Sequence, residues 1–254
     1  MPSSSSPFIS VSGVSLSFGK TRAVDAVSLA VPAGSVFGLV GSDGAGKSSL
    51  LRMIATMVKP DSGSISIGGL DAAAERTKVK GLIGYMPQRF GLYADLTVEE
   101  NIDFFMDIFG IAGAQRKERR EKYLGFSNLL PFLDRLAGNL SGGMKQKLGL
   151  ACVLVHEPRA LILDEPTNGV DPVSRAEFWD ILLSMKAGGM TILVSTAYLD
   201  EGEKCDAIGL MHKSRLLASA PPGELGAGHA TLEDAMVHRI REVDRELIHD
   251  TFKR

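Results

Sequence analysis

Cysteine, long apolar runs and an excess of one charge are all scarce in this sequence. Its two cysteines, Cys152 and Cys205, stand far apart without metal-ligand spacing, which argues against a disulfide scaffold or a zinc site and favours a reduced, cytosolic compartment. The longest apolar run, Leu148–Val155, is far shorter than the ~20 residues that a helix needs to cross a bilayer. The start of the chain lacks the apolar core of a signal peptide and indicates a short disordered leader. We therefore expect that any link to a membrane depends on docking onto another chain.

The charge balance argues against nucleic acid as the main partner. The chain has 28 Lys and Arg against 30 Asp and Glu, a formal net charge of -2, whereas proteins that bind a phosphate backbone carry a basic surplus. The charge-rich stretch Gln115–Lys122 mixes both signs and indicates a solvated helix face better than an RNA-binding patch. A length of 254 residues allows one large core with a subdomain, not two full domains.

Short apolar segments alternate with longer helical patterns, which predicts an α/β fold with a largely parallel sheet. The buried strands of that sheet are expected at Val36–Val40, Leu161–Leu163, Ile192–Ser195 and Ala207–Met211. Near the start, Ile9–Phe18 and Val24–Val31 alternate apolar and polar residues and predict an antiparallel β layer at the front, which Ser64–Ile67 could join.

A mainly helical insertion is predicted between the two halves of this core, over about residues 90–150. The apolar residues of its first helix fall on one face: Val98, Ile102, Phe105, Met106 and Phe109. We expect one domain over residues 8–225 and a C-terminal helical extension over residues 226–254. The charged, amphipathic segment Thr231–Arg254 indicates a peripheral helix better than a dedicated partner-binding segment.

A glycine-rich loop carries the strongest chemical signal. It follows the expected strand Val36–Val40, opens a helical pattern over Ser49–Met57 and matches G-x-x-x-x-G-K-S/T, a context that strongly disfavours a chance turn. Its glycines let backbone N–H groups turn toward phosphate oxygens, and the helix N-terminus adds a favourable dipole. Lys47 is expected to reach the β- and γ-phosphates of a nucleotide, and the Ser48 hydroxyl to hold Mg²⁺. The candidate nucleotide contacts are Gly41, Ser42, Asp43, Gly44, Ala45, Gly46, Lys47, Ser48 and Ser49.

Two adjacent acids end the apolar segment that begins at Ala160. Because ligands of open α/β sheets bind at strand ends, Asp164 is the candidate metal partner, directly or through a metal-bound water. Glu165 is the candidate general base that polarises the attacking water. Taken alone the pair could be a surface turn, but the phosphate loop upstream favours the catalytic interpretation.

A third motif is Ser141 followed by Gly142 and Gly143, just before a helical pattern over Lys145–Val155. This predicts a helix N-terminus that could hold an anion. On the residues alone, a plain helix cap is the better interpretation.

The three motifs together resemble those of the ABC ATPase family, over roughly Phe8–Glu224. Leu140–Gln146 is similar to the family's signature motif, and the order of phosphate loop, signature and acidic strand also matches. The resemblance implies a P-loop NTPase core with a helical signature subdomain. It also implies that Ser141, Gly142 and Gly143 contact the nucleotide bound by a facing cassette.

Further site residues follow from the same resemblance. Gln88 looks like the glutamine that contacts Mg²⁺ and senses the membrane partner. The expected metal ligands are therefore Ser48, Gln88 and Asp164, and the expected catalytic residues are Glu165 and Gln88. Phe18 occupies the place of the aromatic residue that stacks on adenine. The segment Gly169–Pro172 looks like the loop that crosses the dimer interface.

One position departs from the family pattern. Where the family has a histidine after a Ser-Thr pair, this chain has Ala197. Alanine cannot hydrogen-bond a γ-phosphate or orient Glu165, so we expect the chain's own site to bind ATP but to turn it over slowly.

Some segments of the sequence resemble one subgroup of the family in particular. The phosphate loop, the segments Gly84–Tyr93 and Ser141–Cys152, and the missing histidine resemble the first cassette of tandem-cassette ABC-2-type exporter ATPases, of the multidrug efflux and ribosome-associated types. This implies an ATPase that hydrolyses ATP–Mg²⁺ in a head-to-tail dimer with a second cassette, identical or different. It would drive ABC-2-type membrane subunits from the inner face of the cell membrane. The alternative is a non-transport ABC ATPase acting on ribosomes or DNA; Leu140–Gln146 disfavours a P-loop kinase or GTPase.

Overall fold

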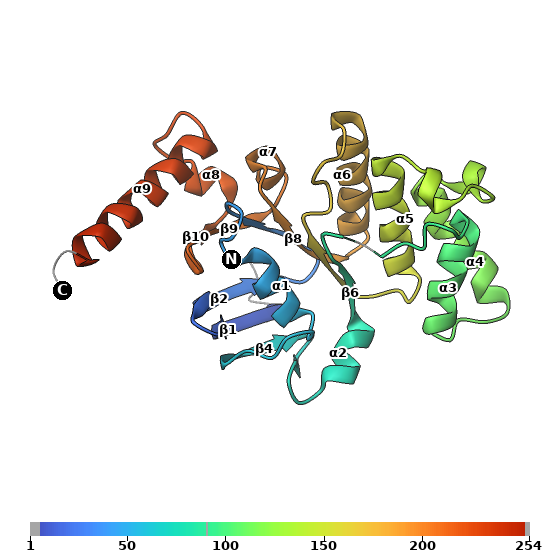
Figure 1. Ribbon diagram of the computed structural model, residues 1–254, viewed down its shortest axis with the longest axis horizontal. Helices are drawn as coiled ribbons and strands as arrows, with labels where there is room; N and C mark the ends of the chain where they lie inside the picture. Colours follow the sequence, from blue (N-terminus) through green and yellow to red (C-terminus); the bar gives the residue numbers. More distant parts are fainter. Residues whose placement is uncertain (1–5, 90, 252–254) are drawn as a thin grey trace.

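Two β-sheets with helices around them make up the part of the chain that the computed structural model describes, residues 6–89 and 91–251, with side chains to residue 244 (Figure 1). The first five residues of the leader expected at the start, and residues 252–254 of the C-terminal extension, lie outside the described residues. No helix within the described ranges is long and apolar enough to span a bilayer.

The larger sheet has the strand order β10-β9-β3-β8-β7-β6, and every neighbouring pair is parallel except β9 and β10. Its strands are β3 (Val36–Val40), β6 (Ile83–Met86), β7 (Ala160–Asp164), β8 (Thr191–Thr196), β9 (Ala207–His212) and β10 (Arg215–Ala220). Every residue of β3, β7 and β8 is buried, because helices or the second sheet cover both faces of a central parallel strand. The predicted parallel sheet is confirmed, with β6 and β10 as two further strands that the apolar pattern did not indicate.

The smaller sheet is antiparallel, in the order β2-β1-β4-β5, and confirms the predicted front layer. Its strands are β1 (Ile9–Phe18), β2 (Thr21–Val31), β4 (Ser62–Ile67) and β5 (Leu70–Asp71). One core cluster fills the space between this layer, the larger sheet and α1 (Lys47–Ile54). This packing fixes α1 behind the glycine-rich loop.

Helix α1 differs from its predicted bounds, Ser49–Met57. It begins at Lys47 and ends at Ile54, because Thr56 takes a left-handed conformation with φ 59. The turn is closed by hydrogen bonds from the Thr56 N–H to the Met53 carbonyl, 3.0 Å, and from the Met57 N–H to the Arg52 carbonyl, 2.9 Å. This is the pattern of a Schellman cap, which usually has glycine at that position.

The helical subdomain projects from the sheet, at the end of the molecule opposite α9 (Leu232–Thr251) (Figure 1). It contains α3 (Val98–Ile108), α4 (Ala114–Phe126), the short turns η1 (Leu130–Phe132) and η2 (Ala137–Asn139), and α5 (Gly142–Leu154). A capping box between Thr97 and Glu100 starts α3. Of the five residues predicted on one face of α3, Val98, Ile102 and Met106 are buried. Phe109 is exposed, and its ring stacks on His156.

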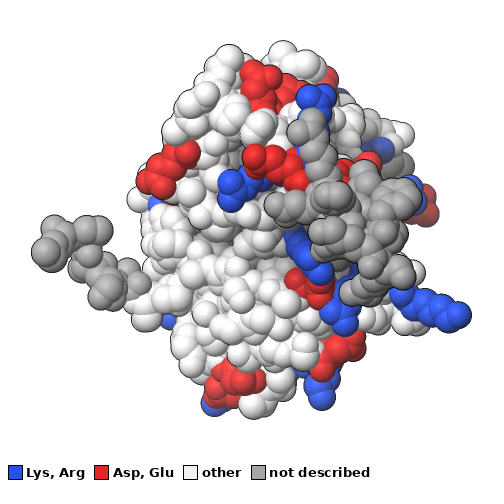
Figure 2. All heavy atoms as spheres, turned by 90° about the vertical axis from the view of Figure 1, so that its left-hand side faces the viewer, with Lys and Arg blue, Asp and Glu red and all other residues white. Residues whose placement is uncertain are grey.

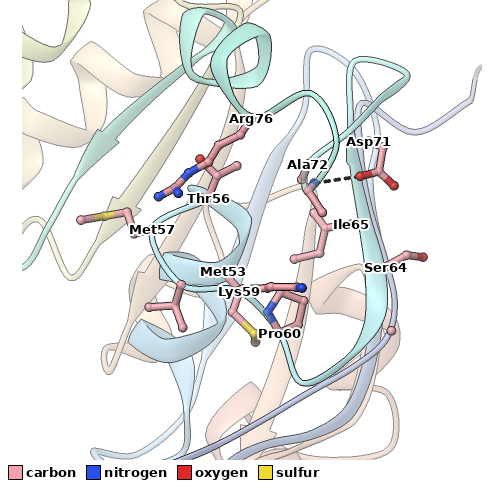
Figure 3. Close-up of a pocket in the computed structure, with 13 residues that line it drawn as sticks. Met53, Thr56, Met57, Lys59, Pro60, Ser64, Ile65, Asp71, Ala72 and Arg76 are labelled. Atoms are coloured by element: carbon pink, nitrogen blue, oxygen red, sulfur yellow. Dashed lines mark hydrogen bonds between the residues drawn. The ribbon is translucent and has the colours of Figure 1, made fainter.

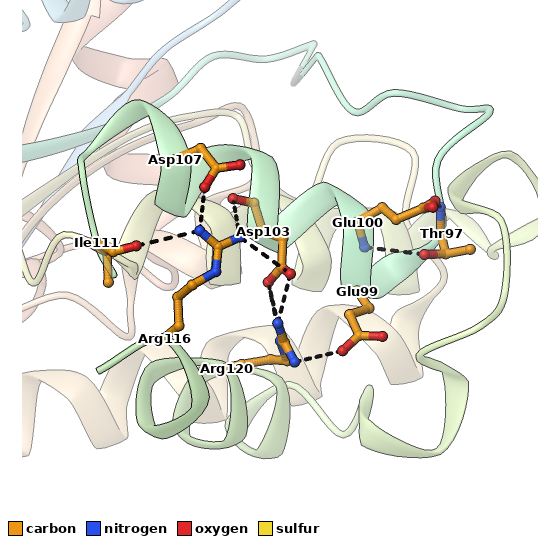
Figure 4. A network of polar contacts seen from close by, with 8 residues as sticks. All are labelled: Thr97, Glu99, Glu100, Asp103, Asp107, Ile111, Arg116 and Arg120. Atoms are coloured by element: carbon orange, nitrogen blue, oxygen red, sulfur yellow. Dashed lines mark hydrogen bonds and ion pairs between the residues drawn. The ribbon is translucent and has the colours of Figure 1, made fainter. Parts of the chain in front are cut away.

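Partly exposed ion pairs join α3 to α4 (Figure 4). The Arg120 guanidinium binds both carboxylate oxygens of Asp103 at 2.7 Å and also pairs with Glu99 at 2.6 Å. Arg116 binds Asp107 and Asp103 from the same side. The remaining helices are α2 (Arg76–Leu82), α6 (Pro172–Ala187), α7 (Leu199–Gly202) and α8 (Pro222–Leu225).

Candidate functional site

The glycine-rich loop wraps around its own lysine. The Lys47 amine, which is almost completely buried, donates hydrogen bonds to the carbonyls of Gly41 at 2.6 Å and Ser42 at 3.1 Å. Gly46 precedes α1 with φ 104, and a Cβ atom there would lie 2.3 Å from the Ala23 carbonyl oxygen, so no other residue fits. The loop therefore ends with its backbone N–H groups at the start of α1, a geometry suited to anions.

The Asp164 carboxylate lies at the end of β7, directly opposite Ser195 of β8. Its Oδ1 accepts hydrogen bonds from Ser48 Oγ at 2.9 Å and from Ser195 Oγ at 2.8 Å. Its Oδ2 is buried and has no hydrogen-bond partner among the described residues. A hydroxyl, a carboxylate with a free oxygen and the nearby Gln88 amide are hard oxygen donors, the kind that Mg²⁺ uses beside substrate phosphates. These residues fit the predicted metal site.

Glu165 connects the acidic strand end to the loop. Its backbone is left-handed, with φ 47, and its carboxylate is almost fully buried. One oxygen lies 3.0 Å from the Lys47 amine, and the other accepts hydrogen bonds from Gln88 Nε2 at 2.9 Å and from Asn168 Nδ2 at 3.2 Å. The lysine expected on the phosphates is therefore paired with the candidate base, and an incoming anion has to replace this carboxylate.

These groups border one hollow of about 440 Å³, named here the main hollow. Its lining consists of Thr21, Arg22, Ala23, Asp43, Gly44, Ala45, Gly46, Lys47, Ser48, Ser49, Gln88 and Glu165. Most of the predicted loop contacts are thus brought together with Gln88 and Glu165. Phe18 is not: its side chain is 56% exposed, and the start of β2, Thr21–Ala23, lines the hollow instead. Stacking of Phe18 on a base stays a prediction.

The signature residues lie elsewhere, at the start of α5. Ser141 caps that helix by accepting a hydrogen bond from the Met144 N–H at 3.3 Å. Ser141 and Gly142 are exposed, whereas Gly143 is buried so tightly that a Cβ atom there would lie 2.4 Å from the Ser174 side chain. None of the three lines the main hollow.

Gln88 is the residue that relates the two regions. It lines the main hollow and also a second hollow of about 380 Å³ beside Gly142 and Lys145. One side chain therefore borders both the phosphate-loop region and the start of α5.

The residues on either side of Ala197, Thr196 and Tyr198, both make contacts with neighbouring elements. Thr196 Oγ1 donates to Glu201 Oε2 at 2.6 Å and accepts from the Tyr198 N–H at 3.0 Å. The Tyr198 ring lies under the Arg175 guanidinium, 4.8 Å from its centroid. Ala197 itself is exposed. The Thr196 hydroxyl is thus engaged with Glu201, whereas the Tyr198 side chain is in contact with Arg175 through its ring.

Several functional neighbours were not found from the sequence. Ser195 binds the Asp164 carboxylate and also accepts the Glu165 N–H at 3.0 Å. Asn168 holds Glu165, and the buried Glu201 accepts from Thr167 Oγ1 at 2.7 Å. The position of Ser195 at a strand end was a usable signal, because parallel strands end at the same sheet edge. Asn168 and Glu201 carried none.

A phosphate loop facing an Asp–Glu pair at the end of a parallel strand defines a P-loop nucleotide-hydrolysing domain. Residues 24–168 match the family model described as ABC transporter, which is more than half of the chain. The chain therefore belongs to the ABC transporter family, as one of its ATP-binding cassettes, and it carries the fold of an ABC ATPase.

Relatives and solved structures agree with this assignment. The chain is 50% identical over 203 residues to a probable multidrug ABC transporter ATP-binding protein of Escherichia coli K12, a match that covers 80% of this chain and 35% of that protein. It therefore spans about a third of the length of that relative. It is 36% identical over 222 residues to the Nod factor export ATP-binding protein I of Ralstonia nicotianae, covering 87% of this chain and 69% of that protein. A solved ATP-binding subunit of an ABC transporter superposes with a TM-score of 0.82 at 28% identity, covering 92% of this chain and 99% of that one.

Proposed function

We propose that this chain is the ATP-binding subunit of an ABC-type exporter, in which it binds and hydrolyses ATP–Mg²⁺ within a head-to-tail pair of cassettes. The supporting observation is that the residues expected to bind nucleotide lie on two separate parts of the surface. Lys47, Ser48 and Glu165 border one hollow, whereas Ser141 and Gly142 are exposed on another part of the surface. If Ser141 contacts a nucleotide, that nucleotide belongs to a facing cassette.

Each residue of the main hollow then has a definite role. Lys47 leaves the Glu165 carboxylate and pairs with the β- and γ-phosphates, which frees the carboxylate to accept a proton from the attacking water. Ser48, Asp164 and Gln88 would hold Mg²⁺, which supplies charge neutralisation at the phosphates. Phe18 would cover the adenine from the end of β1.

The partners proposed are a second cassette, identical or different, and separate ABC-2-type membrane subunits, with the chain peripheral on the cytoplasmic face of the membrane. Two relatives, one a probable multidrug transporter protein and one a Nod factor export protein, support an exporter. Gln88, which borders both hollows, is suited to pass nucleotide state to a membrane subunit.

The alternative, a non-transport ABC ATPase on ribosomes or DNA, has less support. On the face that Figure 2 shows, basic and acidic side chains are interspersed without a broad basic area. Recovery of the tagged chain with a multi-span membrane protein would favour the exporter, and recovery with ribosomes would favour the alternative.

Association of purified chains tests the facing-cassette arrangement. Glu165→Gln keeps the shape of the side chain and removes the base, so bound ATP should persist and hold two chains together. Adding Ser141→Arg places bulk and charge where the facing nucleotide would lie, and it should abolish ATP-dependent association. Size-exclusion chromatography with light scattering measures this, and Lys117→Ala, an exposed lysine on α4 outside the signature motif, serves as a control. Equal association with and without Ser141→Arg would contradict the signature assignment.

A further inference from the structure

A separate cavity of about 270 Å³ lies between the end of α1, strand β4 and helix α2, and is named here the side cavity (Figure 3). It shares no lining residue with the main hollow. Its floor is apolar, since Met53, Ile65 and Ala72 line it and are all buried. Its polar side chains are those of Thr56, Lys59, Ser64, Asp71 and Arg76.

Thr56 is held in a conformation that does not suit its side chain. A β-branched residue with φ 59 is a backbone outlier, and such strain commonly marks a functional position. Thr56 is only 7% exposed, and its hydroxyl has no hydrogen-bond partner among the described residues. A buried hydroxyl without a partner costs free energy, which a ligand in the side cavity would recover.

Two cations lie at the rim of the side cavity. Arg76 extends from α2 toward the turn that carries Thr56, and Lys59 lies on the segment between α1 and β4 (Figure 3). Neither forms an ion pair or a side-chain hydrogen bond with any residue that the structure describes. The one carboxylate at the rim, Asp71, accepts the N–H groups of Ala73 and Ala74, both at 2.8 Å, which lowers its pKa and ties it to the backbone. The rim is therefore positive and available to an anion.

We propose that the side cavity binds a small anionic amphiphile, with a single phosphate or carboxylate head and a short apolar chain. The head lies between Lys59 and Arg76 and accepts a hydrogen bond from the Thr56 hydroxyl. The chain lies on Met53, Ile65 and Ala72. A cavity of this volume takes only a small ligand.

Calorimetric titration with octyl phosphate tests the site, in saturating ADP and Mg²⁺ so that the phosphate loop is occupied. One octyl phosphate should bind per chain, and octanol and inorganic phosphate should each bind at least about tenfold more weakly, because each lacks one half of the recognised chemistry. The Lys59→Ala/Arg76→Ala variant should weaken octyl phosphate binding by about tenfold or more, because two charge-assisted contacts are lost. Lys80→Ala, an exposed cation on the same helix α2 that does not line the cavity, is the matched control and should bind like the parent.

Thr56→Gly distinguishes the contribution of the hydroxyl to binding from its effect on folding. Glycine suits the left-handed position, so the variant should be at least as stable as the parent, while octyl phosphate affinity falls several-fold. Unchanged affinity in this variant would overturn the placement of the head group beside Thr56. No binding by the parent, or equal losses in the Lys80→Ala control and the Lys59→Ala/Arg76→Ala variant, would overturn the site.

Vesicle flotation distinguishes the source of the ligand. Phosphatidylcholine vesicles with phosphatidate should retain the parent but not the Lys59→Ala/Arg76→Ala variant if the amphiphile is a membrane lipid. Binding of octyl phosphate without retention on these vesicles would support a soluble amphiphile. Retention of parent and variant alike, with no octyl phosphate binding, would overturn the proposal.

Discussion

Charged groups are used differently in the main hollow and in the helical subdomain. In the hollow, Lys47 and Glu165 are each less than a tenth exposed and are fixed by further hydrogen bonds. Between α3 and α4, the Arg120 and Asp103 side chains are 24% and 27% exposed. Buried charges interact strongly but become costly once a partner is lost, whereas exposed pairs are screened by water and salt. The hollow therefore depends on each of its charges, and the subdomain on none singly.

The largest effect is expected from breaking the buried pair. Lys47→Ala leaves the Glu165 carboxylate buried without its cation, so the free energy of unfolding should fall by about 3 kcal/mol in the absence of nucleotide. Lys47→Ala/Glu165→Gln should recover most of that loss, because the uncompensated charge is gone. Urea unfolding of the parent, both single variants and the double variant measures this as a cycle. The exposed Lys20→Ala is the control, and a Lys47→Ala variant as stable as the parent would show that the pair is not formed.

A smaller effect concerns catalysis in the hollow. We propose that the chain's own site binds ATP but turns it over slowly, because Ala197 offers no donor and the neighbouring Thr196 hydroxyl already donates to Glu201. Ala197→His should raise the ATPase rate by at least about tenfold, or about 1.4 kcal/mol of barrier, with little change in ATP affinity. Single-turnover hydrolysis by the two proteins decides this. Equal rates, both fast, would mean that the parent site is fully competent.

A third, still smaller effect concerns His156, which contacts both the helical subdomain and the core. Its ring stacks on Phe109 of the subdomain at 4.0 Å, and its Nε2 lies 3.0 Å from the Ile83 carbonyl oxygen of the core. Burial lowers the pKa of His156 below its ordinary value. The unfolded chain therefore takes up the proton first as pH falls, so stability should decline below about pH 6.5 and level off below the folded-state pKa. Comparing urea unfolding at pH 7.5 and 5.5 checks this, and His156→Gln should reduce the pH dependence; an unaltered pH profile would contradict it.

The smallest effect is expected in the subdomain itself. Arg120→Gln removes the pairs with Asp103 and Glu99 (Figure 4), and it should cost no more than about 1 kcal/mol, less at high salt. Urea unfolding at low and high salt measures the difference. Lys117→Gln, whose contact to Glu121 is 3.9 Å long and highly exposed, should change nothing measurable. A loss as large as that from Lys47→Ala would remove the contrast between the two regions.

Much of the fold and part of the site could be predicted because their signals are local. The loop glycines, Lys47 and Ser48 act within one short segment, so spacing alone indicates their arrangement. The contacts of Ser195 and Asn168 depend on strand pairing and on the turn after Glu165, neither of which leaves a short-range pattern. The early end of α1 was missed because threonine occupies a position that glycine normally marks. Strand β10 was missed because its residues are only partly covered, so no apolar run indicates it.

The contact of Gly143 with Ser174 has a mechanical consequence. No side chain fits between them, so the tip of α5 packs directly against the first turn of α6, and α5 cannot move closer without displacing α6. Ser174 is in turn bound through its N–H to Asp171 at 2.9 Å, at the end of the segment that carries Asn168 and Glu165. In the head-to-tail pair proposed above, a displacement of α5 by the facing nucleotide would thus be passed on toward Glu165, this chain's own candidate general base. Each cassette would time its hydrolysis by the occupancy of its neighbour's site.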